Sequence, residues 1–301
     1  MAGIYTSNTF TQIAVDLAAA LAWLKSVGVQ PEPTRIGDYH RAVNLLVSAH
    51  REMDLELMRV QFPRINNMLF EVHEIIEIHK ALAGRFNDEI AKHAKAFASG
   101  PAAYIDEDVE NSSNRARNFG FELSVMSILV RSGVAIDFSI DADVVAQFER
   151  RTLMIECKRP QSEAAVPRRL TDAIKQLERK YQNPARTRCR GIVALDITKA
   201  VNPEFNIFVT RESGDIDRIM SIVVDQFISR NESIWSDFQS SKTIGILLRL
   251  RQMNSIETEG SAKLFYGQQH ALVQVPTATP LDTDVARSLV RTLLVGLQNA
   301  V

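Results

Sequence analysis

Three ionisable side chains of this 301-residue chain have the types and spacing needed to act together on a phosphate ester. Glu156 and Lys158 close a short apolar segment, and because side chains alternate between the two faces of a strand, they share one face. Asp143 opens the preceding apolar segment. Two antiparallel strands over residues 143–148 and 153–158 would therefore bring Asp143 beside the pair.

Two carboxylates that converge with a lysine suit the hydrolysis of a phosphodiester. Carboxylate oxygens hold a hard cation such as Mg²⁺, which lowers the pKa of a bound water and offsets charge on the pentavalent transition state. A nearby lysine positions the water or stabilises negative charge. Lys158 in this role is needed only when a phosphate is bound, so Lys158→Ala is expected to leave the melting temperature nearly unchanged.

Glu156 and Lys158 also have plain structural interpretations. Glu156 could be a surface carboxylate paired with Arg159, and Lys158 could be a solvated residue at the end of a strand. We favour the functional interpretation because the apolar residues 153–155 predict a buried strand, in which a charge needs a partner.

Asp143 has two competitors, Asp137 and Asp141, which share its parity along the chain. The alternation of strand faces therefore does not choose among the three aspartates. We favour Asp143 because it opens the apolar run 144–146.

The elements expected around these residues run helix, three strands, helix, strand. Hydrophobic periodicity predicts a helix at 114–131, strands at 134–138, 143–148 and 153–158, a helix at 164–182 and a strand at 191–196. Beyond them it predicts a helix at 215–229, a strand at 243–251, a hairpin around Gly267 and a helix at 283–297. Asp196 ends the buried strand and is interpreted as a structural cap, with support of Glu156 as the alternative.

Residues 9–100 have a helical pattern throughout. Pro63 is expected to interrupt the second of four helices, because proline lacks the N–H that a helix interior uses. A break at residues 99–101, followed by an acidic stretch, marks a domain boundary. We therefore expect a helical domain over 1–110, structural or partner-binding, and a second domain over 111–301.

The order of these elements, together with the polar residues placed in them, resembles the PD-(D/E)xK nuclease superfamily over roughly residues 112–197. The residues that carry the likeness are Asp143, Glu156 and Lys158 on the strands, Glu122 on the upstream helix and Gln176 on the downstream helix. The sequence departs from the family pattern at Ala142, where a proline is usual.

This resemblance implies a fold, a metal and a catalytic set. The fold would be α/β, with a restriction-endonuclease-like αβββαβ core and a mixed sheet, preceded here by an all-helical N-terminal domain. Mg²⁺ or Mn²⁺ would be held by Glu122, Asp143 and Glu156. Lys158 and Gln176 would complete the catalytic residues.

The formal net charge of −1 conceals a strongly basic segment. Residues 150–190 hold twelve Lys and Arg against four Asp and Glu, an excess of eight positive charges. Such a segment indicates a polyanion-binding surface, a solvated face being the alternative. The candidate phosphate contacts are Arg115, Arg168, Arg169, Lys180, Arg186, Arg188 and Arg190.

Composition and motifs exclude several other classes of protein. With 46% hydrophobic and 24% charged residues, the chain is globular rather than disordered. It has no apolar run of about 20 residues and no secretory signal, so we expect a cytoplasmic protein that does not enter membranes. Two cysteines cannot build a disulfide framework, and motifs of zinc proteases, NTPases, dinucleotide enzymes and serine hydrolases are missing.

The expected function is that of a metal-dependent nuclease that cuts DNA rather than RNA, as an endonuclease rather than an exonuclease. The alternative is a catalytically inactive nucleic-acid-binding or assembly module that retains the nuclease fold. The N-terminal helices are a candidate surface for a protein partner, and a homodimer is left open.

Overall fold

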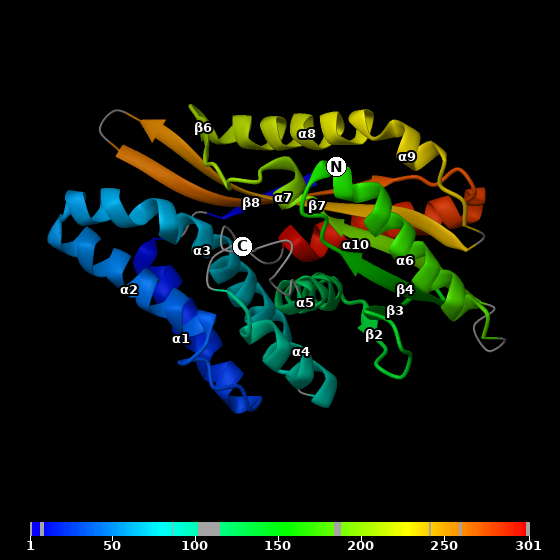
Figure 1. Ribbon diagram of the computed structural model, residues 1–301, viewed down its shortest axis with the longest axis horizontal. Coiled ribbons are helices and arrows are strands. Elements are labelled where there is room, and N and C mark those ends of the chain that lie inside the picture. Colours follow the sequence, from blue (N-terminus) through cyan, green and yellow to red (C-terminus); the bar gives the residue numbers. More distant parts are fainter. Residues whose placement is uncertain are drawn as a thin grey trace. The chain divides into compact units, whose positions relative to one another are not determined.

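The structure is a computed structural model in which the chain forms two compact units. It describes residues 2–6, 9–85, 87–101, 115–183, 188–240, 242–258 and 261–298. The helical unit comprises Thr6–Ser127 and Lys263–Tyr266, and the sheet unit comprises Met1–Tyr5, Ile128–Ala262 and Gly267–Val301 (Figure 1). The domain boundary expected after residue 110 lies outside the described residues, whereas the chain passes between the two units within helix α5.

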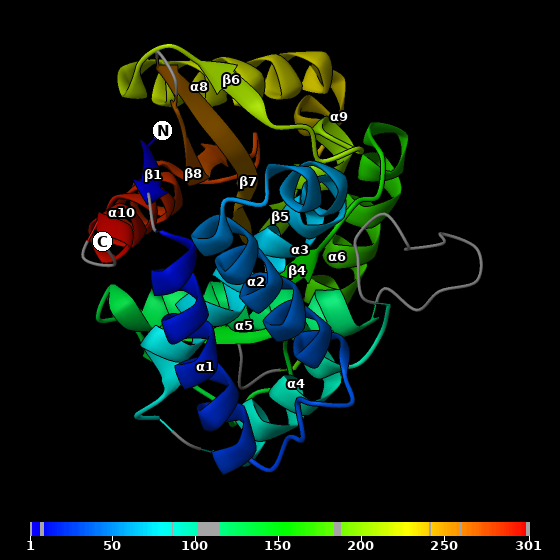
Figure 2. The ribbon, with the colours of Figure 1, turned by 90° about the vertical axis from the view of Figure 1, so that its left-hand side faces the viewer.

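The helical unit is built from helices with well-defined first turns. It contains α1 Phe10–Ser26, α2 Arg35–Glu52, α3 Leu55–Leu82, α4 Asp88–Ala98 and the first part of α5 Arg115–Arg131 (Figure 2). The first four begin at a polar side chain that accepts a backbone N–H of the first turn, in the order Thr9, Thr34, Asp54 and Asn87. Such caps stabilise a helix start by about 1 kcal/mol each. Helices α1, α2 and α3 pack against one another through buried apolar faces.

Pro63 does not interrupt a helix, so that expectation is wrong. Helix α2 ends at Met53, whose φ of 56° is left-handed, and Asp54 then caps α3 by accepting the N–H of Leu57 at 2.9 Å. α3 continues through Pro63, and the Asn67 side chain donates to the Pro63 carbonyl at 3.0 Å. The missing N–H of one proline is outweighed here by the long buried stretch that follows it in the same helix.

The sheet unit contains one mixed sheet. Its strands are β1 Ala2–Thr6, β2 Ala135–Ile136, β3 Val144–Phe148, β4 Arg151–Lys158, β5 Cys189–Asp196, β6 Phe208–Thr210, β7 Thr243–Thr258 and β8 Ser261–Val273. They are ordered β1-β8-β7-β5-β4-β3-β2, with β6 paired to β7. β2, β3 and β4 are antiparallel neighbours, whereas β4, β5 and β7 run parallel. The parallel core explains the apolar run of β5, which is buried on both faces.

Helices cover the two faces of this sheet. They are α6 Val166–Tyr181, preceded by the 3₁₀ turn η2 Glu163–Ala165, then α7 Thr198–Val201, α8 Ser213–Arg230, α9 Glu232–Ser236 and α10 Pro280–Gln298. Gly191 admits α6, because a Cβ there would lie 1.8 Å from the Tyr181 hydroxyl oxygen. Gly245 lies on the opposite face, where a Cβ would lie 3.6 Å from Ala286 of α10. The register pairs Met154 with Gly191, so Met154, Glu156 and Lys158 face α6.

The observed order α5, β2, β3, β4, α6, β5 confirms the predicted sequence of elements, and the chain is a mixed α/β protein with a helical N-terminal region. Two expectations fail. The N-terminal region is not all-helical, because β1 joins the sheet beside β8. The hairpin does not lie around Gly267, which is inside β8, while β7 extends to Thr258. Buried polar residues such as Arg251 and Gln269 break the apolar pattern of these two strands. Among the described residues, no helix is both long enough and apolar enough to cross a membrane.

Candidate active site on strands β3 and β4

The pairing of β3 with β4 brings Asp143 to the end of β4. Val144 lies opposite Ile155, so the residue before β3 meets the residues that close β4. The backbone N–H of Cys157 donates to Oδ2 of Asp143 at 2.8 Å. The carboxylate is therefore fixed by the neighbouring strand itself. Asp137, one of its competitors, instead binds Ser139 and Gln147.

Lys158 lies at the centre of three oxygen atoms. Its Nζ is 3.4 Å from Asp143 Oδ2, 3.4 Å from Glu156 Oε2 and 3.2 Å from the backbone carbonyl of Cys157. The Glu156 side chain is fully buried, and those of Lys158 and Asp143 are 15% and 24% exposed. The structure thus gathers Asp143, Glu156 and Lys158 at one partly accessible point.

Helix α6 adds a second lysine to this point. Lys180 forms an ion pair with Oε1 of Glu156, and its side chain is 18% exposed. The sequence assigned Lys180 to phosphate contacts, so its place on Glu156 is a finding of the tertiary structure. The signal available in the sequence was its spacing of four residues from Gln176, which puts the two on one face of α6.

The surroundings shift the pKa values of Glu156 and Lys158. Burial raises the pKa of Glu156, the negative charge of Asp143 raises it further, and Lys180 and Lys158 offset this only in part. Burial lowers the pKa of Lys158, but the attraction of Asp143 and Glu156 outweighs it and leaves that pKa above its ordinary value. The lysine is therefore held charged, and the glutamate is held in an environment that disfavours its ionised form.

Gln176 lies one turn before Lys180 on α6 and is half-buried. Within the described part of the chain its Oε1 atom is buried and accepts no hydrogen bond. A buried amide oxygen without a donor is costly, and such atoms are rare in folded proteins. Gln176 thus shares the α6 face of Lys180, and its catalytic role stays a prediction.

Glu122 has a described partner within the helical unit. It lies in the helical unit, where Nε2 of His93 is 3.0 Å from its Oε2 atom, joining α4 to α5. Asp143 and Glu156 belong to the sheet unit. Across the described residues, no group of three or more His, Cys, Asp or Glu side chains could hold a metal. Within the sheet unit, the oxygen donors that the structure gathers around Lys158 are two carboxylates and the Cys157 carbonyl. The metal-binding role of Glu122 stays a prediction.

The predicted phosphate-binding residues of the basic segment differ in how exposed they are. Arg168 and Arg188 are exposed, and Arg169 is half-buried with Nη1 4.0 Å from Oδ2 of Asp172. Arg190 is engaged internally, because its Nε donates to Asp282 at 2.9 Å. The two remaining candidates are Arg115 and Arg186.

Arg115 belongs to the helical unit, where its guanidinium carbon lies 5.5 Å from the centroid of the Phe119 ring. Arg186 lies outside the described residues. Among its described residues, the exposed cations of the basic segment are thus Arg168 and Arg188, together with Arg150 and with Lys175 and Arg179 of α6, which the sequence did not single out.

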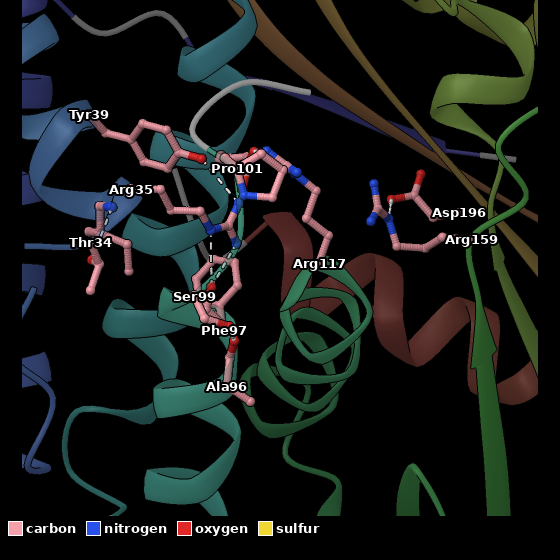
Figure 3. Close-up of polar contacts among 12 residues, drawn as sticks. Thr34, Arg35, Tyr39, Ala96, Phe97, Ser99, Pro101, Arg117, Arg159 and Asp196 are labelled. Carbon is pink, nitrogen blue, oxygen red and sulfur yellow. Dashed lines mark hydrogen bonds and ion pairs between the residues drawn. The ribbon is translucent and has the colours of Figure 1, made fainter. Parts of the chain in front are cut away.

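Asp196 lies on the other face of the sheet from Glu156. It accepts hydrogen bonds from Arg249 at 2.7 Å and Arg251 at 3.1 Å. Figure 3 shows the third arginine, Arg159, whose Nε lies 3.6 Å from Asp196 Oδ2. Burial raises the pKa of Asp196, but the three guanidiniums outweigh it and hold that pKa far below its ordinary value. Arg159 therefore pairs with Asp196 and not with Glu156, and Asp196 has the structural role expected of it.

A comparable cluster holds the helical unit together. Glu71 of α3 forms ion pairs with Arg35 of α2 and Arg117 of α5. Figure 3 shows the Arg35 guanidinium directed at the Phe97 carbonyl, to which its Nη2 donates at 2.7 Å. All these side chains are buried, and each charge has an opposite charge or a carbonyl beside it, which makes the cluster structural.

We found no family model, no curated protein and no solved structure that matches this chain.

Proposed function

We propose that this protein is a metal-dependent nuclease that hydrolyses phosphodiester bonds in the manner of the PD-(D/E)xK superfamily. The observation that carries the proposal is the convergence of Asp143 Oδ2, Glu156 Oε2 and the Cys157 carbonyl on one cationic atom, Nζ of Lys158. A buried glutamate and a part-buried aspartate held this close are expensive for a fold unless they have a task. The observed order α5, β2, β3, β4, α6, β5 supports the restriction-endonuclease-like fold as part of this proposal.

The donor set fits a hard divalent cation. Two carboxylates and a backbone carbonyl meet beside Lys158, and carboxylates are the ligands that Mg²⁺ and Mn²⁺ prefer. Asp143, Glu156 and the Cys157 carbonyl would hold the cation. When bound, it would supply a water of lowered pKa and would neutralise charge on the phosphate. Glu122 is not needed for this set.

The side chains of the chain itself have defined tasks in this scheme. Asp143 is held in place by the N–H of Cys157, and Glu156 is held by Lys158 of its own strand, so both carboxylates are preorganised. Lys158 remains charged at neutral pH and can orient a water or stabilise the developing negative charge. Preorganised charges in a partly buried site act without the cost of reordering solvent.

A polyanionic substrate is supported by the charges around α6. Arg168, Lys175 and Arg179 are exposed and recur at spacings that place them along one face of the helix, next to the face that carries Gln176 and Lys180. A phosphate backbone that follows these cations would pass beside Glu156. We propose DNA as this backbone, cut internally.

The test is a nuclease assay on DNA and RNA of several forms, with Mg²⁺ or Mn²⁺ and with excess chelator. Cleavage should vanish in chelator and return with either cation, and Glu156→Ala should be inactive. Glu204→Ala is the matched control, because Glu204 is exposed and also belongs to the sheet unit. Cleavage that persists in chelator would exclude the metal mechanism. Binding of nucleic acid without any cleavage would favour an inactive module that keeps the fold.

A further inference from the structure

The four charged side chains of the site sum to zero without any metal. Asp143 and Glu156 contribute two negative charges, while Lys158 and Lys180 contribute two positive ones. Lys158 belongs to the same strand as Glu156, but Lys180 comes from α6. The negative charge that would attract a divalent cation is therefore already neutralised by the two lysines.

The two lysines hold different oxygens of one buried carboxylate. Lys158 lies 3.4 Å from Oε2 of Glu156, and Lys180 is paired with Oε1. A divalent cation placed on this carboxylate beside both ammoniums would raise the site to a net charge of +2. At separations of about 4 Å and the dielectric typical of a part-buried site, each repulsion between like charges is large compared with thermal energy.

Of the two lysines, Lys180 is the one whose ammonium can move away from Glu156. It lies in the last turn of α6, and its side chain is still 18% exposed, so a rotation of its four-carbon stem takes the ammonium towards solvent. Lys158 is less exposed and contacts Asp143, Glu156 and the Cys157 carbonyl at once. Lys180 also lies next to the exposed cations of α6, in position to meet a phosphate.

We propose that Lys180 is a charge gate of the metal site: its ammonium occupies Glu156 in the free protein, opposes the binding of a divalent cation, and turns to a substrate phosphate when the cation binds. The proposal rests on the proposed function, because it presupposes a metal at Asp143 and Glu156. It makes Lys180 a positioning residue, and it links metal binding to substrate binding. By the reciprocity of linked equilibria, each should strengthen the other.

The first experiment measures Mn²⁺ affinity by calorimetry on the full chain, without nucleic acid. Lys180→Gln keeps a hydrogen-bond donor for Glu156 and removes the charge, so it should bind Mn²⁺ about tenfold or more tightly than the wild type. Lys180→Arg keeps the charge and should bind as weakly as the wild type. The matched control is Arg211→Gln, which removes an exposed cation of the sheet unit outside the site and should leave the Mn²⁺ affinity unchanged.

The outcomes separate this proposal from the proposed function. Mn²⁺ affinities that are equal in the wild type and Lys180→Gln overturn the gate and leave the metal site standing. A gain in Lys180→Arg as large as that in Lys180→Gln also overturns it, because the charge is then irrelevant. No Mn²⁺ binding in any variant overturns both proposals. Should Lys180→Gln not fold, as judged by circular dichroism, Lys180→Met provides the neutral variant.

The second experiment tests where Lys180 goes. Affinity for a fluorescent DNA duplex is measured with and without Ca²⁺, which binds oxygen ligands like Mg²⁺. Ca²⁺ should strengthen DNA binding by the wild type more than by Lys180→Gln, because only the wild type releases an ammonium to the phosphates. An equal gain in both proteins contradicts the movement of Lys180 to the substrate.

Discussion

The backbone N–H of Cys157 donates to Oδ2 of Asp143 at 2.8 Å, across the pairing of β3 with β4. Through this contact the strand that carries Glu156 and Lys158 also sets the position of the aspartate. The carboxylates are close because Asp143 directly precedes β3, whose register against β4 places Val144 opposite Ile155.

Glu156→Gln should abolish cleavage without destabilising the fold at neutral pH. Because the pKa of Glu156 is raised in the folded state, ionisation opposes folding, and this penalty appears as pH rises from the ordinary glutamate pKa through the raised value. At pH 7 the variant should therefore melt at the wild-type temperature or a few degrees above it, and at pH 4 the difference should shrink. Thermal melts at both pH values check this, with Glu204→Gln as the exposed control. A variant that melts well below the wild type at pH 7 would show that Glu156 is mainly structural.

Lys158→Ala should lower both stability and activity, which changes the expectation drawn from the sequence. The lysine is paired with two carboxylates and is only 15% exposed, so its removal leaves Asp143 and Glu156 facing each other with Lys180 alone. We expect a loss of about 1–3 kcal/mol in the free energy of unfolding and about a hundredfold in the cleavage rate. Denaturant unfolding and single-turnover cleavage measure the two separately. An unchanged unfolding free energy would mean that the observed pairing contributes nothing to the fold.

Neutralising Arg168 and Arg188 together should weaken DNA binding and flatten its salt dependence. Both are exposed cations of the basic segment, and each phosphate contact contributes roughly one unit to the slope of log K against log salt. The double variant to Gln should therefore lose about two units of slope. Arg218→Gln, an exposed residue of α8 that pairs with Asp215, is the control and should leave the slope unchanged. A slope equal to that of the wild type in the double variant would identify this segment as a solvated face.

Asp196→Asn should destabilise the sheet unit strongly. The change leaves Arg249, Arg251 and Arg159 around a neutral amide, and removing one partner of a buried charge cluster costs about 3–5 kcal/mol. Because the pKa of Asp196 is depressed, its contribution is present above the ordinary aspartate pKa and is lost as pH falls. Urea unfolding at pH 7 measures the loss.

The matched control for Asp196 is Asp284→Asn. Asp284 is 73% exposed and lies 3.9 Å from Arg287, so this change should stay within about 0.5 kcal/mol. Equal losses in the two variants would contradict the structural role of the arginine cluster.

His93 should make the helical unit more stable in mild acid. Burial lowers the pKa of His93, but its hydrogen bonds to Glu122 and to the Glu89 carbonyl outweigh this and raise it above the ordinary value. A raised histidine pKa gives stability that is fully present below about pH 6.5 and is lost as pH rises through the folded-state value. His93→Gln should therefore be less stable than the wild type at pH 5.5, with a smaller difference at pH 9. A gap between the two proteins that stays constant with pH would show that His93 acts only by packing.

The sequence predicted the elements whose hydrophobic pattern is regular. β3, β4, α6 and β5 follow their predicted ranges within a few residues, because their buried faces repeat with the period of a strand or a helix. The effect of Pro63 was wrongly predicted because the rule that proline interrupts a helix considers one residue at a time. The buried face of α3 continues for several turns beyond Pro63 and stabilises the helix. β8 was missed around Gly267 because buried glutamines and a histidine occupy positions where apolar residues were expected.

The residues of the candidate site likewise divide into those that the sequence could group and those whose neighbours depend on tertiary packing. Asp143, Glu156 and Lys158 could be grouped from strand alternation and the expected antiparallel pairing, which are local properties of the sequence. The partner of Glu156 on α6 could not, because it depends on how a helix packs across the sheet. Glu122 was placed by resemblance alone, and its hydrogen bond to His93 of another helix has no local signal.

Both units include residues of strand β8, which are distant along the chain from most of the other residues of each unit. Residues Lys263–Tyr266 belong to the helical unit, where the ring of Tyr266 stacks on His73 with centroids 4.5 Å apart. Strand β1 is hydrogen-bonded to β8, which lies far from it along the chain. Contacts between such distant positions form late and slow folding. A nascent chain that ends before β8 would therefore hold neither unit complete, and the sheet around the candidate site would still lack the pairing of β1 with β8.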